Sequence, residues 1–387
     1  MMAARPESSG DMTTSTIVDY FACGHAGSAS WRAAAEAALA QCGSGVRGAT
    51  LGFLYATDAY AEHYADIVEF LRRRTGIPHW VGTIGLGICA SGQEYLDEPA
   101  LAVLCCSFKE ESFRVFSGLM APRDVARAQL DSACGQASFG VVHAHPATPS
   151  LTSMVRELAA RTESGFIVGG LTSSRDRSVQ YADGLAEGGL SGVMFSGEIV
   201  VATRLTQGCA PLGPKHVVTD ARHNILVSLD GRPALDVFRE DIGPDYSGNL
   251  GLVAGRIFVG LPIEGSDTGD YVVRNLVGLD TTHRLVAVGE SVRVGRSVIF
   301  CKRDRPSASD DLDRMLSSIQ SGLYRQPRGG VYFSCLGRGA SLFGENSEEL
   351  RIVRDRLGEV PLVGFFCNGE ISHNRLYGYT VVLTLFL

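Results

Sequence analysis

Apolar and polar residues follow the same order in three parts of the chain. Each part has an apolar strand, a loop and helix, a second apolar strand with glycine, then a hairpin and a closing strand. A unit of about sixty residues that returns three times is a supersecondary building block. We therefore expect the loops after its strands to occupy equivalent places and to hold any functional site. The three parts, each with a Val-Gly pair near its middle, are 49–108 (Val81), 137–205 (Val168) and 330–387 (Val363).

Helical periodicity marks the segments between these strands. The segment WRAAAEAALAQC predicts a helix from Trp31 to Cys42, with Ser30 as its N-cap. Apolar residues recur at three and four residue spacing over 60–74, which predicts a second helix. The segment 151–164 supplies the helix of the second part, and 309–320 predicts an amphipathic helix before the third.

The pattern of apolar and polar residues changes between residue 208 and about residue 304. Short alternating runs separated by Asp-Gly, Pro and Gly turns predict strands joined by hairpins. Pro and Gly at 208–215 predict a linker. We therefore expect a disordered leader (1–16), an N-terminal domain (17–210) and a C-terminal domain (211–387). The order of elements predicts an α/β fold, or an α+β fold, in which mixed sheets are backed by helices.

Composition and charge exclude several classes of protein. A net charge of −7 argues against nucleic-acid binding, which needs a basic face, and against attachment to anionic lipid. No apolar run reaches the length of about 18 residues that crosses a bilayer. The ten cysteines form no C-x-x-C pair, and several lie in apolar strands, as small buried residues do in a reducing compartment. We expect a cytoplasmic protein without structural disulfides.

Polar residues gather in the turn that follows the strand containing Val363. Cys367, Asn368, Glu370, His373 and Asn374 lie there, and ligand sites of open α/β sheets lie beyond the carboxyl ends of strands. This cluster offers a carboxylate, an amide and an imidazole to a ligand. Alternatively, Asn368 begins a hairpin turn and Glu370 is exposed or caps a backbone group.

The segment SCLGRG follows the first strand of the third part in the same way. Its Arg338 can present a planar, charged fork to a carboxylate or phosphate, and Gly337 lets backbone amides approach a ligand. Alternatively, Arg338 pairs with an acid such as Glu370 in a buried structural bridge. Cys335, next to this arginine, is a candidate reactive thiol if its loop is exposed.

Other candidate chemistry is weaker. His143 and His145 share one face of a strand, where imidazoles can bind a metal or a haem iron, but no third ligand has metal spacing. No G-x-S-x-G motif is present, and no G-x-G-x-x-G opens a helix. We therefore expect no bound metal or cofactor, and haem stays an alternative.

The succession of segments resembles the FIST family of sensory proteins over nearly the whole chain. The motifs that carry the resemblance are VGTIGLGICASG, LDGRPALDVF, VRVGRSVIFCKRD, SCLGRGASLFG and PLVGFFCNGEI. The resemblance implies a FIST N-like and a FIST C-like domain. It also implies a sensor of a small ligand, such as an amino acid or another small anion or zwitterion, and some bacterial members bind haem and sense nitric oxide.

We expect the ligand in a cleft between the two halves. Its predicted contacts are Arg338, Gly337, Cys335, Cys367, Asn368 and Glu370, together with Cys89, Ser91, Thr172 and Ser173 in loops that close the cleft. The chain has no kinase, receiver, cyclase or F-box segment, so it would act through a separate signalling partner. The alternatives are an enzyme with Glu370 as general base, a haem-based gas sensor, or an interaction scaffold.

Overall fold

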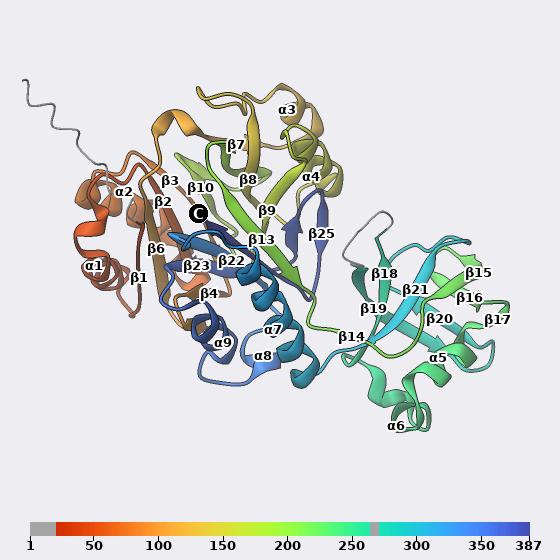
Figure 1. Ribbon diagram of the computed structural model, residues 1–387. Helices are drawn as coiled ribbons and strands as arrows, with labels where there is room; N and C mark the ends of the chain where they lie inside the picture. Colours follow the sequence, from red (N-terminus) through yellow and green to blue (C-terminus); the bar gives the residue numbers. More distant parts are fainter. Residues whose placement is uncertain (1–20, 264–270) are drawn as a thin grey trace, which may run out of the picture.

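The computed structural model describes residues 21–263 and 271–387. The predicted leader (1–16) and the first residues of the predicted N-terminal domain (17–20) lie outside the described residues. The larger body consists of three six-stranded sheets with helices on their outer faces, and a separate β-rich lobe is attached to it (Figure 1). The prediction of mixed sheets backed by helices is confirmed.

The first sheet has the strand order β1-β6-β2-β3-β10-β11, and the second has β25-β24-β9-β8-β12-β7. The third sheet has the order β13-β26-β22-β23-β4-β5. The strands of the first sheet are β1 (Phe21–Gly27), β2 (Leu51–Thr57), β3 (His79–Gly85), β6 (Ala100–Cys106), β10 (Gln180–Ala182) and β11 (Leu185–Ala186). Those of the second are β7 (Phe113–Leu119), β8 (Ala137–Ala144), β9 (Phe166–Leu171), β12 (Leu190–Ser196), β24 (Glu370–Ser372) and β25 (Arg375–Tyr377). Those of the third are β4 (Gly87–Ala90), β5 (Gln93–Leu96), β13 (Val201–Thr206), β22 (Gly329–Cys335), β23 (Leu362–Cys367) and β26 (Val381–Phe386).

Each sheet contains one parallel pair, β2–β3, β8–β9 or β22–β23, whose strands are connected through a helix. The glycine of each Val-Gly pair lies on the second strand, where a Cβ would fall 1.6 to 1.8 Å from a carbonyl oxygen of the first strand. Only glycine permits that approach. The opposed residues are Gly82 and Leu54, Gly169 and Val142, and Gly364 and Tyr332. That the three parts share one fold in detail stays a prediction, which a superposition of their backbones would test.

The hairpin that follows each parallel pair joins a different sheet. β4 follows β3 but pairs with β23, β10 follows β9 but pairs with β3, and β24 follows β23 but pairs with β9. An Asn368 hairpin joining β23 to β24 is therefore absent. In the second part, the hairpin and closing strand that the sequence predicts do not form between 189–197 and 198–206, because both edges of β12 are occupied by β7 and β8. β13 pairs with β26 instead, so the two halves of the chain share sheets.

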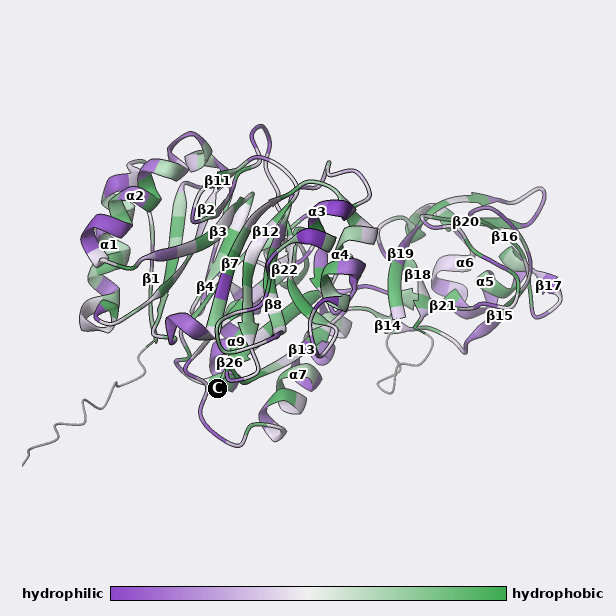
Figure 2. Ribbon diagram, turned by 90° about the horizontal axis from the view of Figure 1, so that it is seen from above, coloured by the Kyte–Doolittle hydropathy of each residue, from purple (hydrophilic) through white to green (hydrophobic). Residues whose placement is uncertain are grey.

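The inner faces of the three sheets pack against one another. Tyr55, His143 and Phe333, one from each sheet, lie with ring centres 5.5 to 6.4 Å apart. Figure 2 shows hydrophobic colour along these strands and hydrophilic colour on the helices and loops around them. The interior is therefore apolar, with few polar side chains buried at its centre.

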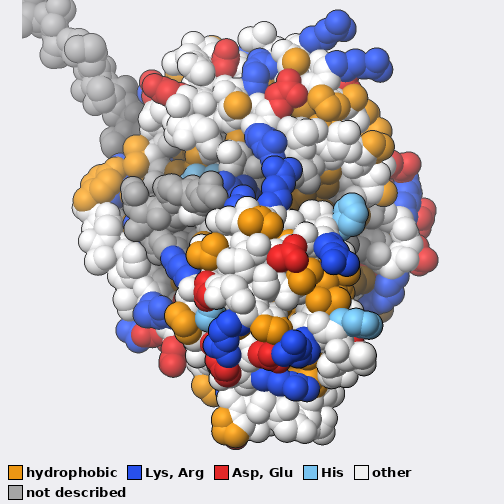
Figure 3. Space-filling model, turned by 90° about the vertical axis from the view of Figure 1, so that its right-hand side faces the viewer, with side chains coloured by type: hydrophobic (Ala, Val, Ile, Leu, Met, Phe, Trp, Pro, Cys, Tyr) orange, Lys and Arg blue, Asp and Glu red, His pale blue; other side chains and the backbone are white. Residues whose placement is uncertain are grey.

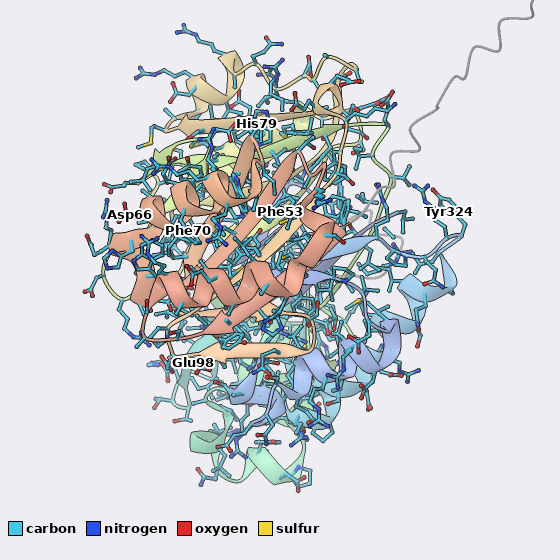
Figure 4. The ribbon with its side chains drawn as sticks, turned by 90° about the vertical axis from the view of Figure 1, so that its left-hand side faces the viewer. Phe53, Asp66, Phe70, His79, Glu98 and Tyr324 are labelled. Atoms are coloured by element: carbon cyan, nitrogen blue, oxygen red, sulfur yellow. The ribbon has the colours of Figure 1, made fainter. Side chains whose placement is uncertain are left out.

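The outer faces carry the helices. α1 and α2 cover the first sheet, as Figure 4 shows from that side, with Asp66 and Phe70 on α2. α3 and α4 pack on the second sheet and α7, α8 and α9 on the third. The Ser30 hydroxyl accepts a hydrogen bond from the Ala33 amide at 3.4 Å, which confirms the predicted cap. The helices are α1 (Trp31–Cys42), α2 (Tyr64–Thr75), α3 (Pro122–Arg127), α4 (Leu151–Ala160), α7 (Arg305–Ser321), α8 (Ala340–Phe343) and α9 (Glu348–Leu357), with 3-10 turns at Gly43–Val46, Asp58–His63 and Glu110–Ser112.

The β-rich lobe is an antiparallel sheet closed on itself, because β18 pairs with β21 as well as with β19. It contains the predicted hairpins, and its core packs against α5. No helix among the described residues is long and apolar enough to cross a membrane. The elements of the lobe are β14 (Ala210–Pro211), β15 (His216–Arg222), β16 (Ile225–Leu229), β17 (Arg232–Pro233), α5 (Ala234–Ile242), α6 (Pro244–Ser247), a 3-10 turn (Leu250–Val253), β18 (Ile257–Pro262), β19 (Tyr271–Asp280), β20 (Leu285–Val288) and β21 (Ser297–Lys302).

Candidate functional site

The loops that follow β9, β22 and β23 meet at one end of the body. The Asn368 amide donates to the Leu171 carbonyl at 3.0 Å, and the Ser173 hydroxyl donates to the Phe366 carbonyl at 2.6 Å. The Leu336 amide donates to the Cys367 carbonyl at 3.0 Å. The structure therefore brings together most of the loops that the sequence singled out, although they come from two sheets.

Arg338 is buried in this region and pairs with Glu349, not with Glu370. Its Nε lies 2.8 Å from Oε1 of Glu349, and its guanidinium lies over the Phe343 ring at 5.0 Å. Glu349 also accepts hydrogen bonds from the Tyr332 hydroxyl, at 2.7 Å, and from the Gly339 amide, at 2.9 Å. Arg338 is thus part of a buried bridge that ties α9 to β22 and its loop.

Glu370 is buried on β24. Its Oε2 accepts hydrogen bonds from the Thr380 amide, at 3.1 Å, and from the Thr380 hydroxyl, at 2.5 Å. Burial raises the pKa of Glu370 to about 8, although the Thr380 hydrogen bonds and the positive charge of Arg338 favour the carboxylate. A carboxyl with such a pKa can take up or release a proton near neutral pH.

The three cysteines among the predicted contacts are protonated thiols, not thiolates, in this environment. Burial raises the pKa of Cys335 to about 12 and raises the pKa of Cys89 and of Cys367 well above the usual range. Because the thiolate is the nucleophile, these residues are poor nucleophiles at neutral pH. All the cysteines of the described residues are free.

The remaining predicted contacts are spread more widely. The Ser91 hydroxyl donates to the Val360 carbonyl and accepts from the Leu362 amide, so Ser91 lies at the opposite end of β23 from Asn368. The Thr172 hydroxyl is buried against that of Thr83, 2.9 Å away. The Gly337 carbonyl accepts a hydrogen bond from Arg303 at the junction with the lobe. Apart from Cys89, two residues before it on β4, Ser91 is distant from the predicted contacts around Asn368.

Sequence reasoning missed two buried carboxylates next to Arg338. Glu349 is the second residue of α9, and a charged residue in the segment EELRIVRDRL is typical of a solvated helix. Burial and the negative charge of Glu349 raise the pKa of Glu94 on β5 to about 8. The one available signal was the position of Glu349 in the first turn of a helix, where acidic residues favour the dipole.

A pocket of about 980 Å³ opens elsewhere, between the edges of the second and third sheets. One wall is β13 with α7, the other is the hairpin of β24 and β25, and the N-terminal ends of β8 and β9 form the floor. Ile263 of the lobe lies at its rim. We call it the seam pocket. Figure 3, viewed from the lobe side, shows a shadowed hollow behind the lobe with Lys and Arg side chains beside it. Neither Arg338 nor Glu370 lines the pocket, but His373 and Asn374 of the predicted turn do.

The other two seams between sheets are closed by side chains. His25 on β1 hydrogen bonds the Tyr95 hydroxyl on β5 at 2.7 Å, which joins the first and third sheets. Phe113 on β7 packs edge-on against His79 on β3, with ring centres 5.4 Å apart, which joins the first and second sheets. The pocket of about 980 Å³ lies at the third seam, between β13 and β25.

The seam pocket is positively charged. It is lined by Arg204 on β13, Arg314 on α7 and Arg375 on β25. Asp311 pairs with Arg314 at 2.8 Å. Within residues 21–263 and 271–387, neither Arg204 nor Arg375 forms an ion pair, so their charges face the pocket uncompensated.

The residues present do not form a metal centre. No group of three or more His, Cys, Asp or Glu side chains in the described part of the chain is arranged to hold a metal ion. His143 is in the core, with Nε2 3.0 Å from the Tyr55 hydroxyl, and burial lowers its pKa to about 3. His145 accepts a hydrogen bond from the Ala147 amide. In the seam pocket His373 is the single imidazole of the described lining, beside Met315 and Tyr377.

The fold and the pocket define a two-part α/β protein with a ligand-sized pocket that is open to the surface. The FIST N domain model matches residues 50–232, and the FIST C domain model matches residues 234–373. The chain therefore belongs to the FIST family, whose domains are associated with sensing in signal transduction. It is 29% identical over 374 residues to an uncharacterized protein of Mycobacterium tuberculosis, covering 92% of this chain and 96% of the relative. It is 28% identical over 360 residues to an uncharacterized protein of Mycobacterium bovis, covering 87% and 90%.

Proposed function

We propose that this protein is a cytoplasmic sensor that binds a small organic anion or zwitterion in the seam pocket and signals through a separate protein partner. The observation that carries the proposal is the open seam between β13 and β25, because the two other seams are closed by side chains. Its volume of about 980 Å³ is at the upper end of small-molecule sites, about 300 to 1,000 Å³.

The position of the pocket also supports a route for the signal. Asp311, in the pocket wall, accepts hydrogen bonds from the amides of Gln207 and Gly208, both at 3.0 Å. These amides belong to the linker between the body and the lobe. A ligand that changes the position of α7 would therefore change how the linker is held, and the lobe would move relative to the body.

The predicted contacts Arg338, Glu370, Cys335 and Asn368 have a different place in this proposal. They do not line the pocket, and Glu370 is in the same hairpin as His373. We propose that they stabilise the loops and the hairpin near the pocket, and that direct contact with a ligand falls to Arg204, Arg375 and His373.

An enzyme that uses Glu370 as general base is the second candidate. The raised pKa of Glu370, about 8, favours it, because a carboxyl with that pKa exchanges protons near neutral pH. A ligand bound in the seam pocket and recovered unchanged would support the sensor, whereas its conversion would support the enzyme.

Native mass spectrometry of the purified protein, incubated with a library of organic acids and amino acids, tests the proposal. Ser318 is exposed on α7 and lines the pocket, so Ser318→Trp should fill the pocket and abolish the bound mass. Ser317→Trp is the matched control, because Ser317 is exposed on the same helix outside the pocket. The proposal fails if no compound binds, or if Ser318→Trp binds as the parent protein does.

A further inference from the structure

The floor of the seam pocket contains an apolar patch that is continuous with the core, beside Ser138 and Ser164. Phe139 is buried in the central core, and Ile199 and Leu205 pack against that core while lining the pocket. Phe166 and Met315 line the pocket from β9 and α7, and the His373 ring packs edge-on against Phe166, with centres 4.7 Å apart. A ligand that fits this floor has an apolar body, since a polar one would lose its hydration there without replacement.

The cationic groups are on both walls above this floor. Arg204 is on the wall of β13 and α7, where its Nε donates to the Ser318 hydroxyl at 3.3 Å, and Arg375 begins β25 on the opposite wall. The chain as a whole carries −7, so this positive charge is not a general property of its surface. An arginine fork is suited to bind a carboxylate, sulfonate or phosphate through paired hydrogen bonds.

Among the described residues, the pocket has no carboxylate that is free to pair with a ligand's ammonium group. Asp311 is the single acidic residue of the described lining, and both of its carboxylate oxygens are engaged: Oδ1 with Arg314, and Oδ2 with the linker amides of Gln207 and Gly208. An ammonium would therefore meet Arg204 and Arg375 without compensation, and like charges placed together oppose binding. This arrangement discriminates against amino acids and other zwitterions.

We propose that the ligand of the seam pocket is an amphiphilic organic anion, with an apolar body on Phe139, Phe166 and Met315 and an acidic head held by Arg204 and Arg375. This inference rests on the proposed function, because it assigns the class of ligand to the same pocket. It narrows that function to acids without a nearby ammonium group.

A matched set of compounds with one hydrocarbon chain tests the class. The probes are decanoate, decan-1-ol, decylamine and 2-aminodecanoate, titrated into the full chain by calorimetry below their aggregation concentrations. Decanoate should bind at least tenfold more tightly than each of the other three, and its affinity should fall as salt rises, since exposed charges are screened. Arg204→Gln and Arg375→Gln should each weaken decanoate binding by roughly 10- to 100-fold, the range of a hydrogen bond to a charged group.

Two further variants test whether decanoate binds in the seam pocket. Arg325→Gln removes an exposed arginine that does not line the pocket, and should leave decanoate binding unchanged. Ser318→Trp should abolish it. Equal binding of decan-1-ol and decanoate, or tighter binding of 2-aminodecanoate, would overturn the assignment of an acidic head.

The inference and the proposed function can fail separately. If decanoate does not bind but an amino acid does, and Ser318→Trp removes that binding, the sensor function stands and the amphiphilic anion is wrong. If neither binds the pocket, both are wrong. Binding of decanoate that Ser318→Trp leaves intact would place it elsewhere on the protein and also overturn the inference.

Discussion

The Arg338 guanidinium and the Glu349 carboxylate form an ion pair with both side chains fully buried, 2.8 Å between Nε and Oε1. Removing one partner leaves the other charge buried and unpaired, which typically costs about 3–5 kcal/mol. We therefore expect Arg338→Ala to lose stability on this scale in urea denaturation. Arg351→Ala is the control. It removes an exposed arginine of α9, the helix of Glu349, that pairs with Glu348 at 3.6 Å, and it should cost at most about 1 kcal/mol. A stable Arg338→Ala protein that no longer binds ligand would instead make Arg338 a ligand contact.

Glu370 should make stability depend on pH. Its pKa rises from 4.5 to about 8 on folding, so between these values the folded state holds a proton that the unfolded state has lost. Stability is then fully present below about pH 4.5 and is lost as pH rises toward 8, at up to about 1.4 kcal/mol per pH unit for one group. Glu370→Gln, which mimics the protonated form, should reduce this slope between pH 5 and 8 in urea titrations and leave the part that comes from Glu94, whose pKa is also raised to about 8. An unchanged slope would show that Glu370 is ionised in the folded state.

Several elements were readable from sequence because their cause is local. The helix Trp31–Cys42 follows from its Ala-rich periodicity and the Ser30 cap, and the hairpins of the lobe follow from Asp-Gly and Pro turns. The partner of a hairpin is not local. The strand β4 pairs with β23, more than 270 residues away. Nothing in its own sequence, GICA, indicates which strand it pairs with.

The seam pocket could not be predicted for the same reason. Its walls come from β13, α7 and the β24–β25 hairpin, and each cationic side chain looks like an ordinary exposed arginine in its own segment. The sequence did single out the turn that holds His373 and Asn374, because polar residues after a buried strand are a local signal. It favoured Glu370 and Arg338, whose burial depends on packing between sheets.

Asp311 should control the linker between body and lobe. Asp311→Ala leaves the Gln207 and Gly208 amides without their acceptor, and an unsatisfied buried donor costs about 1–3 kcal/mol. We expect faster hydrogen exchange at these two amides, measured by mass spectrometry on overlapping peptides. Asp313→Ala is the control, because Asp313 on the same helix pairs with Arg356 instead. Equal exchange in both variants would remove the linker from the proposed signalling route.

The purified protein should show no Soret band in its visible absorption spectrum. A haem held by protein side chains needs an axial ligand, and the seam pocket offers His373 as a single imidazole that already packs on Phe166. A Soret band that disappears in His373→Ala, while the Asn374→Ala neighbour keeps it, would replace the amphiphilic-anion reading with a haem-based sensor.

The three Val-Gly pairs should be equally intolerant of a side chain. In Gly82→Ala, Gly169→Ala and Gly364→Ala, the new Cβ would lie 1.6 to 1.8 Å from a backbone carbonyl oxygen of the paired strand. The parallel strands must separate, and overpacking of this kind costs about 1–3 kcal/mol or more. Gly184→Ala has no heavy atom within 4 Å of the new Cβ and should be close to neutral in urea denaturation. Similar losses at the three positions would support one shared fold for the three parts, whereas a loss confined to one position would contradict it.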